Sequence, residues 1–146
     1  MTDWIKPVAK WVSFLYRMNT IDTRVQVIES WMKKSTGWIS GLQTILPPRP
    51  PKHTYRKYML AKTEILELWL IAWGEGAQTS VHNHSEKESW LRVIQGELYE
   101  EEPGGFVMNR IPAGGTGYQE GDAGVHRIFT VGPAYSIHIS APITLS

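Results

Sequence analysis

The chain has 146 residues, a length that fits one domain with one hydrophobic core. Hydrophobic residues make up 42% and charged residues 20%, an ordinary balance for a globular protein. The formal net charge of +1 argues against a nucleic-acid partner or an acidic membrane surface, and no apolar run is long enough to span a bilayer. No signal-peptide pattern opens the chain, so we expect a cytoplasmic protein.

The first part of the chain predicts helices. Apolar residues between Trp4 and Tyr16 recur at helical spacing, which indicates one amphipathic helix. A second helix is expected after Asp22 or Thr23, and a third, short one over residues 38–46. Residues 1–46 are therefore expected to form a helical N-terminal cap.

A proline-rich segment at residues 47–51 separates these helices from the rest of the chain. Such a run can form neither a helix nor a central strand, so residues 47–54 are expected to be an extended connector. From residue 55 onward, short apolar segments are separated by Gly, Pro or Asn, which predicts a β-sandwich or barrel over residues 55–146. The expected strands are 55–60, 65–73, 80–84, 89–95, 97–101, 106–111, 124–131 and 135–139.

The chain has no cysteine, so it can form no disulfide, thiolate metal site or cysteine nucleophile. A metal ion would need imidazole or carboxylate ligands, which suit Fe(II), Mn, Ni, Cu or Zn. His82 and His84 are two positions apart, so on a strand their imidazoles project from the same face. Such a pair is suitably spaced to bind one metal ion.

The surroundings of this histidine pair resemble the metal-binding motifs of cupins. Gly76 precedes the pair by six residues, and Glu88 and then Gly96 follow it, as in the first cupin motif. His126 follows a glycine-bearing turn, which resembles the second cupin motif and its third imidazole. The resemblance implies a mainly β fold, a cupin barrel (double-stranded β-helix or jelly roll) with N-terminal α-helices, as a single domain. Three imidazoles would leave coordination positions open for substrate and O2.

A closer resemblance is to the cysteine dioxygenase family. Residues 70–84 resemble its metal-site strand, which carries Trp-Gly-x-Gly followed by Ile-His-Asp-His. Residues 91–98, 124–128 and 135–139 resemble three later family segments, in the same order. The resemblance implies a non-haem Fe(II) thiol dioxygenase. Such an enzyme oxidises L-cysteine or a related small thiol to its sulfinic acid, and both atoms of O2 are added to sulfur.

The family's metal ligands and substrate-pocket residues match five positions of this chain. His82, His84 and His126 match the three ligands of one Fe(II) ion. Tyr55 matches a tyrosine of the substrate pocket. Lys57 stands where the family has an arginine that clamps the substrate carboxylate, and a lysine is a point charge without a bidentate fork.

The family's Ser-His-Tyr relay is matched in part. Ser136 and His138 match the first two members and are expected to orient the oxidised substrate, whereas Ser140 stands in place of the tyrosine. Alternation along a strand puts all three on one face, which is expected to line the cavity. Ser89 occupies the position of a cysteine that is crosslinked to the tyrosine in some members. Arg56, beside Lys57, is the other candidate for holding a carboxylate, but it should face the opposite side.

Two alternatives remain open at this point. One is another cupin metalloenzyme that uses Glu88 as a fourth ligand, although alternation favours Ser89 for the side of the strand that faces the metal. The other is a non-catalytic cupin that binds or senses a metal. We expect a small thiol and O2 as partners, with no nucleic acid and no membrane, and the sequence leaves the oligomeric state open.

Overall fold

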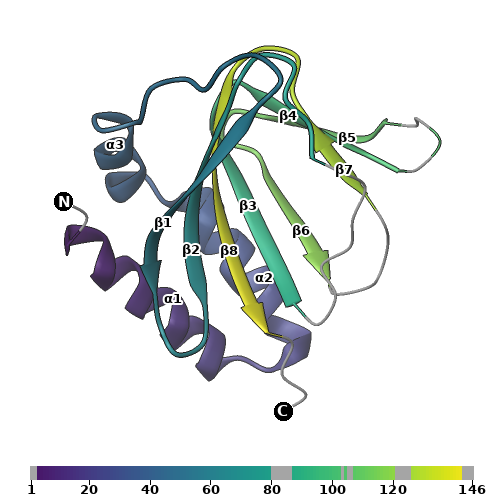
Figure 1. Cartoon of the computed structure of the whole chain (residues 1–146). Coiled ribbons are helices and arrows are strands. Elements are labelled where there is room, and N and C mark those ends of the chain that lie inside the picture. The colour runs from purple at the N-terminus through teal and green to yellow at the C-terminus, as the bar shows by residue number, and fades with distance from the viewer. Residues whose placement is uncertain (1–2, 80–86, 103, 105–106, 121–125, 143–146) are drawn as a thin grey trace.

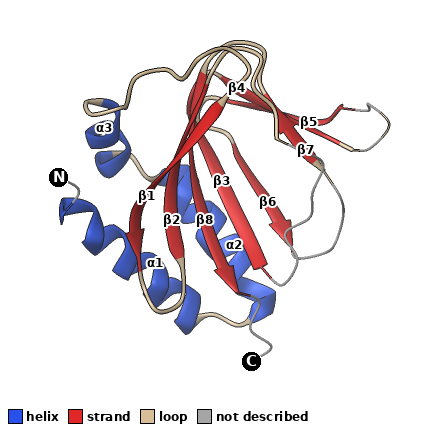
Figure 2. Ribbon diagram, viewed as in Figure 1, coloured by secondary structure: helices blue, strands red, loops and turns tan. Residues whose placement is uncertain are grey.

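The structure is a computed structural model that describes residues 3–79, 87–102, 104, 107–120 and 126–142. Its helices precede its strands, as Figures 1 and 2 show. The helical elements are η1 (Asp3–Ile5), α1 (Lys6–Met18), α2 (Ile21–Lys34) and α3 (Gly37–Gln43). The strands are β1 (Tyr55–Lys62), β2 (Glu67–Trp73), β3 (Lys87–Gln95), β4 (Glu97–Glu101), β5 (Val107–Pro112), β6 (Thr116–Glu120), β7 (Arg127–Phe129) and β8 (Ala134–Pro142).

The three expected helices are confirmed. The third is shorter than predicted, because α3 ends at Gln43 and the sequence pattern extends to residue 46. At the end of the helix, the Thr44 hydroxyl donates a hydrogen bond of 2.7 Å to the Gly41 carbonyl. A threonine that bonds locally in this way competes with continuation of the helix. None of the helices among the described residues has the length and apolar character needed to cross a membrane.

The strands form two antiparallel sheets. One has five strands in the order β1-β2-β8-β3-β6, and the other has three in the order β5-β4-β7. The turn at Gly96 joins β3 of the first sheet to β4 of the second. Gly96 has a φ of +77°, and a Cβ there would lie only 2.5 Å from the Pro133 carbonyl oxygen, so the turn requires glycine.

Strand β6 was not predicted by the sequence pattern. The segment around it contains Gly114, Gly115 and Gly117, and glycine is depleted in strands. The strand is nevertheless formed by pairing with β3, where Trp90 is opposite Tyr118. A Cβ at Gly117 would lie 3.2 Å from Ile111 Cδ1, so tight packing favours the glycine here. The expected strand at 80–84 lies outside the described residues, and of the one expected at 124–131 the structure describes β7.

The helices cover one face of the five-stranded sheet (Figure 1). Strand β8 illustrates how the sequence produces this layer. Its residues Tyr135, Ile137 and Ile139 pack in the same apolar cluster as Ile28 and Met32 of α2. A second apolar cluster lies between the two sheets and includes residues 71, 73, 93, 98, 111 and 128. Alternation in β8 therefore sends its even-numbered residues toward the space between the sheets.

The connector at residues 47–54 has no regular secondary structure, as the prolines predict. It is nevertheless fixed to the sheet by several hydrogen bonds. The Thr54 carbonyl accepts a hydrogen bond of 2.8 Å from the Gly74 amide, and the His53 amide donates one of 2.7 Å to the Glu75 carbonyl. The Tyr135 hydroxyl donates a hydrogen bond of 2.6 Å to the Pro47 carbonyl. These contacts place the start of β1 beside the end of β2.

Candidate metal and substrate site

A cavity of about 340 Å³ lies between the two sheets. It brings together residues that the sequence analysis had selected from distant segments. The cavity lining includes Tyr55, Lys57, Ser89, His126, His138 and Ser140. These residues come from β1, β3 and β8 and from the position that precedes β7. The polar face that alternation predicted for β8 is thus on the cavity side, with His138 and Ser140 lining the cavity directly.

His126 is the one predicted metal ligand that the structure describes. Its side chain is only 4% exposed, and Nδ1 lies 2.9 Å from Glu100 Oε2. A carboxylate accepts hydrogen bonds, so in the neutral ring the proton belongs on Nδ1 and Nε2 keeps its lone pair. A buried imidazole that is held in this way by a carboxylate has the chemistry of a metal ligand.

His82 and His84 lie outside the described residues, so their part in a metal site stays a prediction. Within the described part of the chain, no group of three or more histidines and carboxylates is arranged to hold a metal ion. His126 fits the chemistry of the predicted site, and Ser136 and His138 lie on the neighbouring sheet.

Ser136 and His138 are hydrogen-bonded to each other, with Oγ and Nε2 separated by 2.7 Å. Ser136 is fully buried, and its Oγ also accepts a hydrogen bond of 2.8 Å from Trp73 Nε1 on β2. The centroids of the Trp73 and Tyr55 rings lie 5.2 Å apart. The indole of Trp73 therefore contacts both Ser136 and the predicted pocket tyrosine. Trp73 belongs to the Trp-Gly-x-Gly segment of the family resemblance, but a motif does not reveal these contacts.

Lys57 lines the cavity, and its Nζ lies 4.5 Å from the centroid of the Trp69 ring. This cation–π contact holds the ammonium group over an aromatic surface. Tyr55 lies two residues earlier on the same strand and also lines the cavity. The alternation of β1 therefore presents a phenol and an ammonium group to the same cavity.

Glu100 is a residue of the cavity that sequence reasoning missed. It lines the cavity and contacts His126, and its side chain is 13% exposed. A signal was available, because Glu100 lies two positions after the buried Leu98 on β4 and so shares its inward face. An acidic residue on an inward face is unusual unless it has a partner.

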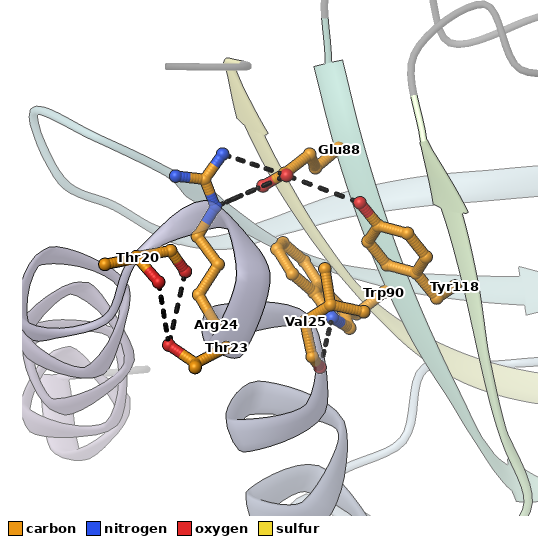
Figure 3. Close-up of polar contacts among 7 residues, drawn as sticks. All are labelled: Thr20, Thr23, Arg24, Val25, Glu88, Trp90 and Tyr118. Atoms are coloured by element: carbon orange, nitrogen blue, oxygen red, sulfur yellow. Dashed lines mark hydrogen bonds and ion pairs between the residues drawn. The ribbon is translucent and has the colours of Figure 1, made fainter. Parts of the chain in front are cut away.

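Glu88 is not arranged as a metal ligand, and this corrects the alternative that made it the fourth one. Its carboxylate points toward Arg24 of α2 (Figure 3). Both side chains are buried, with exposed fractions of 0% for Glu88 and 1% for Arg24. Arg24 Nη2 lies 2.9 Å from Glu88 Oε1, and Arg24 Nε lies 3.0 Å from Oε2. The Tyr118 hydroxyl donates a further hydrogen bond of 3.3 Å to Glu88. Ser89, the next residue, lines the cavity instead, as alternation predicts.

The pKa of Arg24 reflects this pairing. Burial by itself lowers the pKa of the guanidinium, but the hydrogen bond and the negative charge of Glu88 outweigh it and raise the pKa above its ordinary value. Arg24 therefore stays charged and is neutralised locally by Glu88. The pair joins α2 to β3, together with a hydrogen bond of 3.2 Å from Trp90 Nε1 to the Val25 carbonyl (Figure 3).

Comparison with known sequences identifies the family. The profile described as cysteine dioxygenase type I matches residues 14–144, which is most of the chain. The chain belongs to the cysteine dioxygenase type I family. A curated relative, cysteine dioxygenase type 1 of Danio rerio, is 30% identical over a segment that covers 51% of this chain and 44% of the relative. The matched segment thus spans less than half of that relative's length.

Solved structures show that the fold of this family member is that of the cupins. A cupin superfamily protein of Desulfitobacterium hafniense has a TM-score of 0.59 and 14% identity, and the match covers 70% of this chain and 88% of the other. An RmlC-like cupin of Desulfovibrio desulfuricans has a TM-score of 0.53 and 20% identity, with 60% and 82% covered. KdgF from a Halomonas species has a TM-score of 0.54 and 20% identity, with 62% and 82% covered. The predicted mainly β cupin fold with N-terminal helices is confirmed.

Proposed function

We propose that this protein is a non-haem Fe(II) thiol dioxygenase that oxidises L-cysteine or a related small thiol to its sulfinic acid. The reaction adds both atoms of O2 to the thiol sulfur, which is oxidised while O2 is reduced, and no other oxidant is needed. Membership of the cysteine dioxygenase type I family supports this reaction class. The main support for the proposal is that His126, Tyr55, Lys57 and His138 line the same cavity.

In this proposal, His82, His84 and His126 hold one Fe(II) ion. When bound, the ion supplies the redox chemistry between thiolate and O2, and three histidines without a carboxylate leave positions open for both. The cavity is of the size that small-molecule sites occupy, at the lower end of the usual range. A small thiol therefore fits it better than a large one does.

The other cavity residues bind and orient the substrate. Lys57 provides a positive charge for a substrate carboxylate, and Tyr55 lies beside it on the same face of β1. His138 is held by Ser136 and can donate a hydrogen bond to an oxygen of the sulfinate product. Ser140 is too short to reach as far as the family's tyrosine, so a water molecule would bridge the gap.

The test is anaerobic loading with Fe(II), followed by O2 consumption with cysteine, 3-mercaptopropionate or cysteamine and detection of the sulfinate product. Wild-type protein is expected to consume O2 only when a thiol is present. His126→Ala is expected to lose most iron binding and turnover, because it removes one of three ligands. His53→Ala is the matched control, since His53 is exposed, its ring is hydrogen-bonded to the Gly76 carbonyl, and it does not line the cavity.

The same assay distinguishes the thiol dioxygenase from the two alternative functions. O2 uptake without any thiol would indicate another cupin oxygenase. Stoichiometric iron binding with no O2 uptake across the three thiols would favour a non-catalytic metal-binding or sensor cupin. If His126→Ala bound iron and turned over substrate as wild type does, the three-histidine site would be wrong.

A further inference from the structure

We propose that Glu100 is a positioning residue that fixes the orientation of the His126 ring, and that Asn109 in turn orients Glu100. The inference deepens the proposed function, since it rests on His126 being a metal ligand. Asn109 lies on β5, Glu100 lies on β4, and His126 immediately precedes β7; these strands are neighbours in the smaller sheet, in the order β5-β4-β7.

Glu100 and His126 contact each other across neighbouring strands of the smaller sheet. Glu100 is opposite Ile128 in the pairing of β4 with β7, and His126 lies two residues before Ile128. The carboxylate and the imidazole are therefore diagonal neighbours across the two strands, within reach of each other on one face. Glu100 Oε2 lies 2.9 Å from His126 Nδ1. The register of β4 and β7 therefore brings the two side chains together.

The contact between Glu100 and His126 is largely buried. The His126 side chain is 4% exposed and that of Glu100 is 13% exposed, so little water screens the interaction. A carboxylate on Nδ1 holds the ring in one orientation. Partners that orient a metal ligand in this way support metal binding.

The Glu100 carboxylate has a second partner on β5. Asn109 is directly opposite Glu100 in the pairing of β4 with β5. Its Nδ2 donates a hydrogen bond of 3.1 Å to Glu100 Oε1. The two carboxylate oxygens thus have different partners, one on each side of β4, and the side chain is held at both ends.

The matched control comes from the same strand. Glu97 is bonded to Arg110 and to the Tyr99 hydroxyl, and it is not part of the cavity lining. The hydrogen bond from Arg110, followed by that from Tyr99, lowers the pKa of Glu97. Glu97→Gln therefore removes a carboxylate charge from β4 without touching the contact between Glu100 and His126.

The experiment measures Fe(II) binding rather than activity alone. Wild type, Glu100→Ala, Glu100→Gln, Asn109→Ala and Glu97→Gln are titrated anaerobically with Fe(II) against a chromophoric chelator. The metal-free proteins are first compared by circular dichroism and melting temperature to show that each is folded. The number of iron ligands is measured by X-ray absorption, and the symmetry of the site by the electron paramagnetic resonance of the nitric oxide adduct.

Glu100→Ala is expected to weaken Fe(II) binding by about 10- to 100-fold, the usual cost of losing such a partner. Glu100→Gln should lose less Fe(II) affinity, because its amide oxygen still accepts a hydrogen bond from His126 Nδ1. The loss of affinity in Asn109→Ala should be smaller still. Glu97→Gln should bind as wild type does. The resonance spectrum should broaden in Glu100→Ala and be largely restored in Glu100→Gln, which a general loss of stability would not produce.

Wild-type affinity and an unchanged spectrum in Glu100→Ala would overturn the inference. So would one ligand fewer in both Glu100 variants, because Glu100 would then bind the metal itself. If the wild type bound Fe(II) but oxidised no thiol, the proposed function would be wrong. The Fe(II) affinities of the variants would still decide the role of Glu100. A wild type that binds no Fe(II) would overturn both.

Discussion

At the scale of single residues, we predict that the cavity departs from its family where substrate and product would be held. The motif resemblance puts Lys57 at the position of an arginine and Ser140 at the position of a tyrosine. Both side chains line the cavity, so the changes affect the site directly. Lys57 is held over Trp69, which places a positive charge beside the cavity without the fork of an arginine.

The role of Lys57 can be tested with thiols that differ in their carboxylate. Lys57→Ala is expected to lower kcat/KM for cysteine and 3-mercaptopropionate by about 10- to 100-fold, the cost of one hydrogen bond to a charged group. It should affect cysteamine, which has no carboxylate, far less. Arg56→Ala is the matched control, since alternation sends Arg56 to the opposite face from Lys57. Equal losses for all three thiols would contradict carboxylate recognition by Lys57.

At the scale of elements, one strand serves two layers. Alternate residues of β3 face α2 and the cavity, so Glu88 and Trp90 bind the helix while Ser89 lines the cavity. The helix is thereby coupled to the strand that follows the predicted histidine pair. The ion pair of Arg24 and Glu88 contributes to this contact beside an apolar cluster, as do hydrogen bonds from Trp90 and Arg92 to carbonyl groups of α2.

Breaking this buried pair should destabilise the protein strongly. Arg24→Ala leaves the Glu88 carboxylate buried without its partner, which typically costs about 3–5 kcal/mol in the free energy of unfolding. The double variant Arg24→Met/Glu88→Leu should recover most of that loss, because it removes both charges. Denaturant unfolding measures the free energy of unfolding of the single and the double variant.

The exposed pair of Arg17 and Glu64 provides the comparison, with side chains 61% and 93% exposed. Arg17→Ala should change the free energy of unfolding by less than about 1 kcal/mol, as exposed ion pairs contribute little. If Arg24→Ala lowered the free energy of unfolding by as little, the buried pair would not stabilise the contact between α2 and β3.

At the scale of the whole molecule, the helices close one side of the larger sheet and leave the site between the two sheets. We propose that the helices, the connector and the strands form one cooperative domain. The support is the apolar cluster in which Ile28 and Met32 of α2 pack with Trp90 of β3 and Ile139 of β8. Without the helices, that face of the sheet would be exposed to water.

A single domain should unfold in a single transition. The loss of helix signal in far-UV circular dichroism and the change in tryptophan fluorescence should coincide during denaturation. Trp90→Ala should lower the midpoint of both signals together, because it costs about 3–5 kcal/mol at the centre of the helix–sheet layer. Two separate transitions, or a shift in one signal only, would show that the helices are an independent unit.

The sequence by itself determined much of this protein, because local periodicity records which side of an element faces the interior. It predicted the three helices, the β-rich remainder and the cupin fold. It also predicted that Tyr55 and Lys57 would share one cavity with His126 and His138. The helices and strands follow from the periodicity of short segments. The cupin fold and the shared cavity are what the resemblance to the cysteine dioxygenase family implies.

Only the tertiary structure decided which distant side chains are paired. Glu88 binds Arg24, which lies 64 positions away in the chain, and Glu100 contacts His126 across 26 positions. Strand β6 forms despite its glycines because β3 provides a partner for it. The physical reason is the same in each case. Alternation tells which face a residue occupies, whereas its partner on that face depends on the register and order of strands and helices.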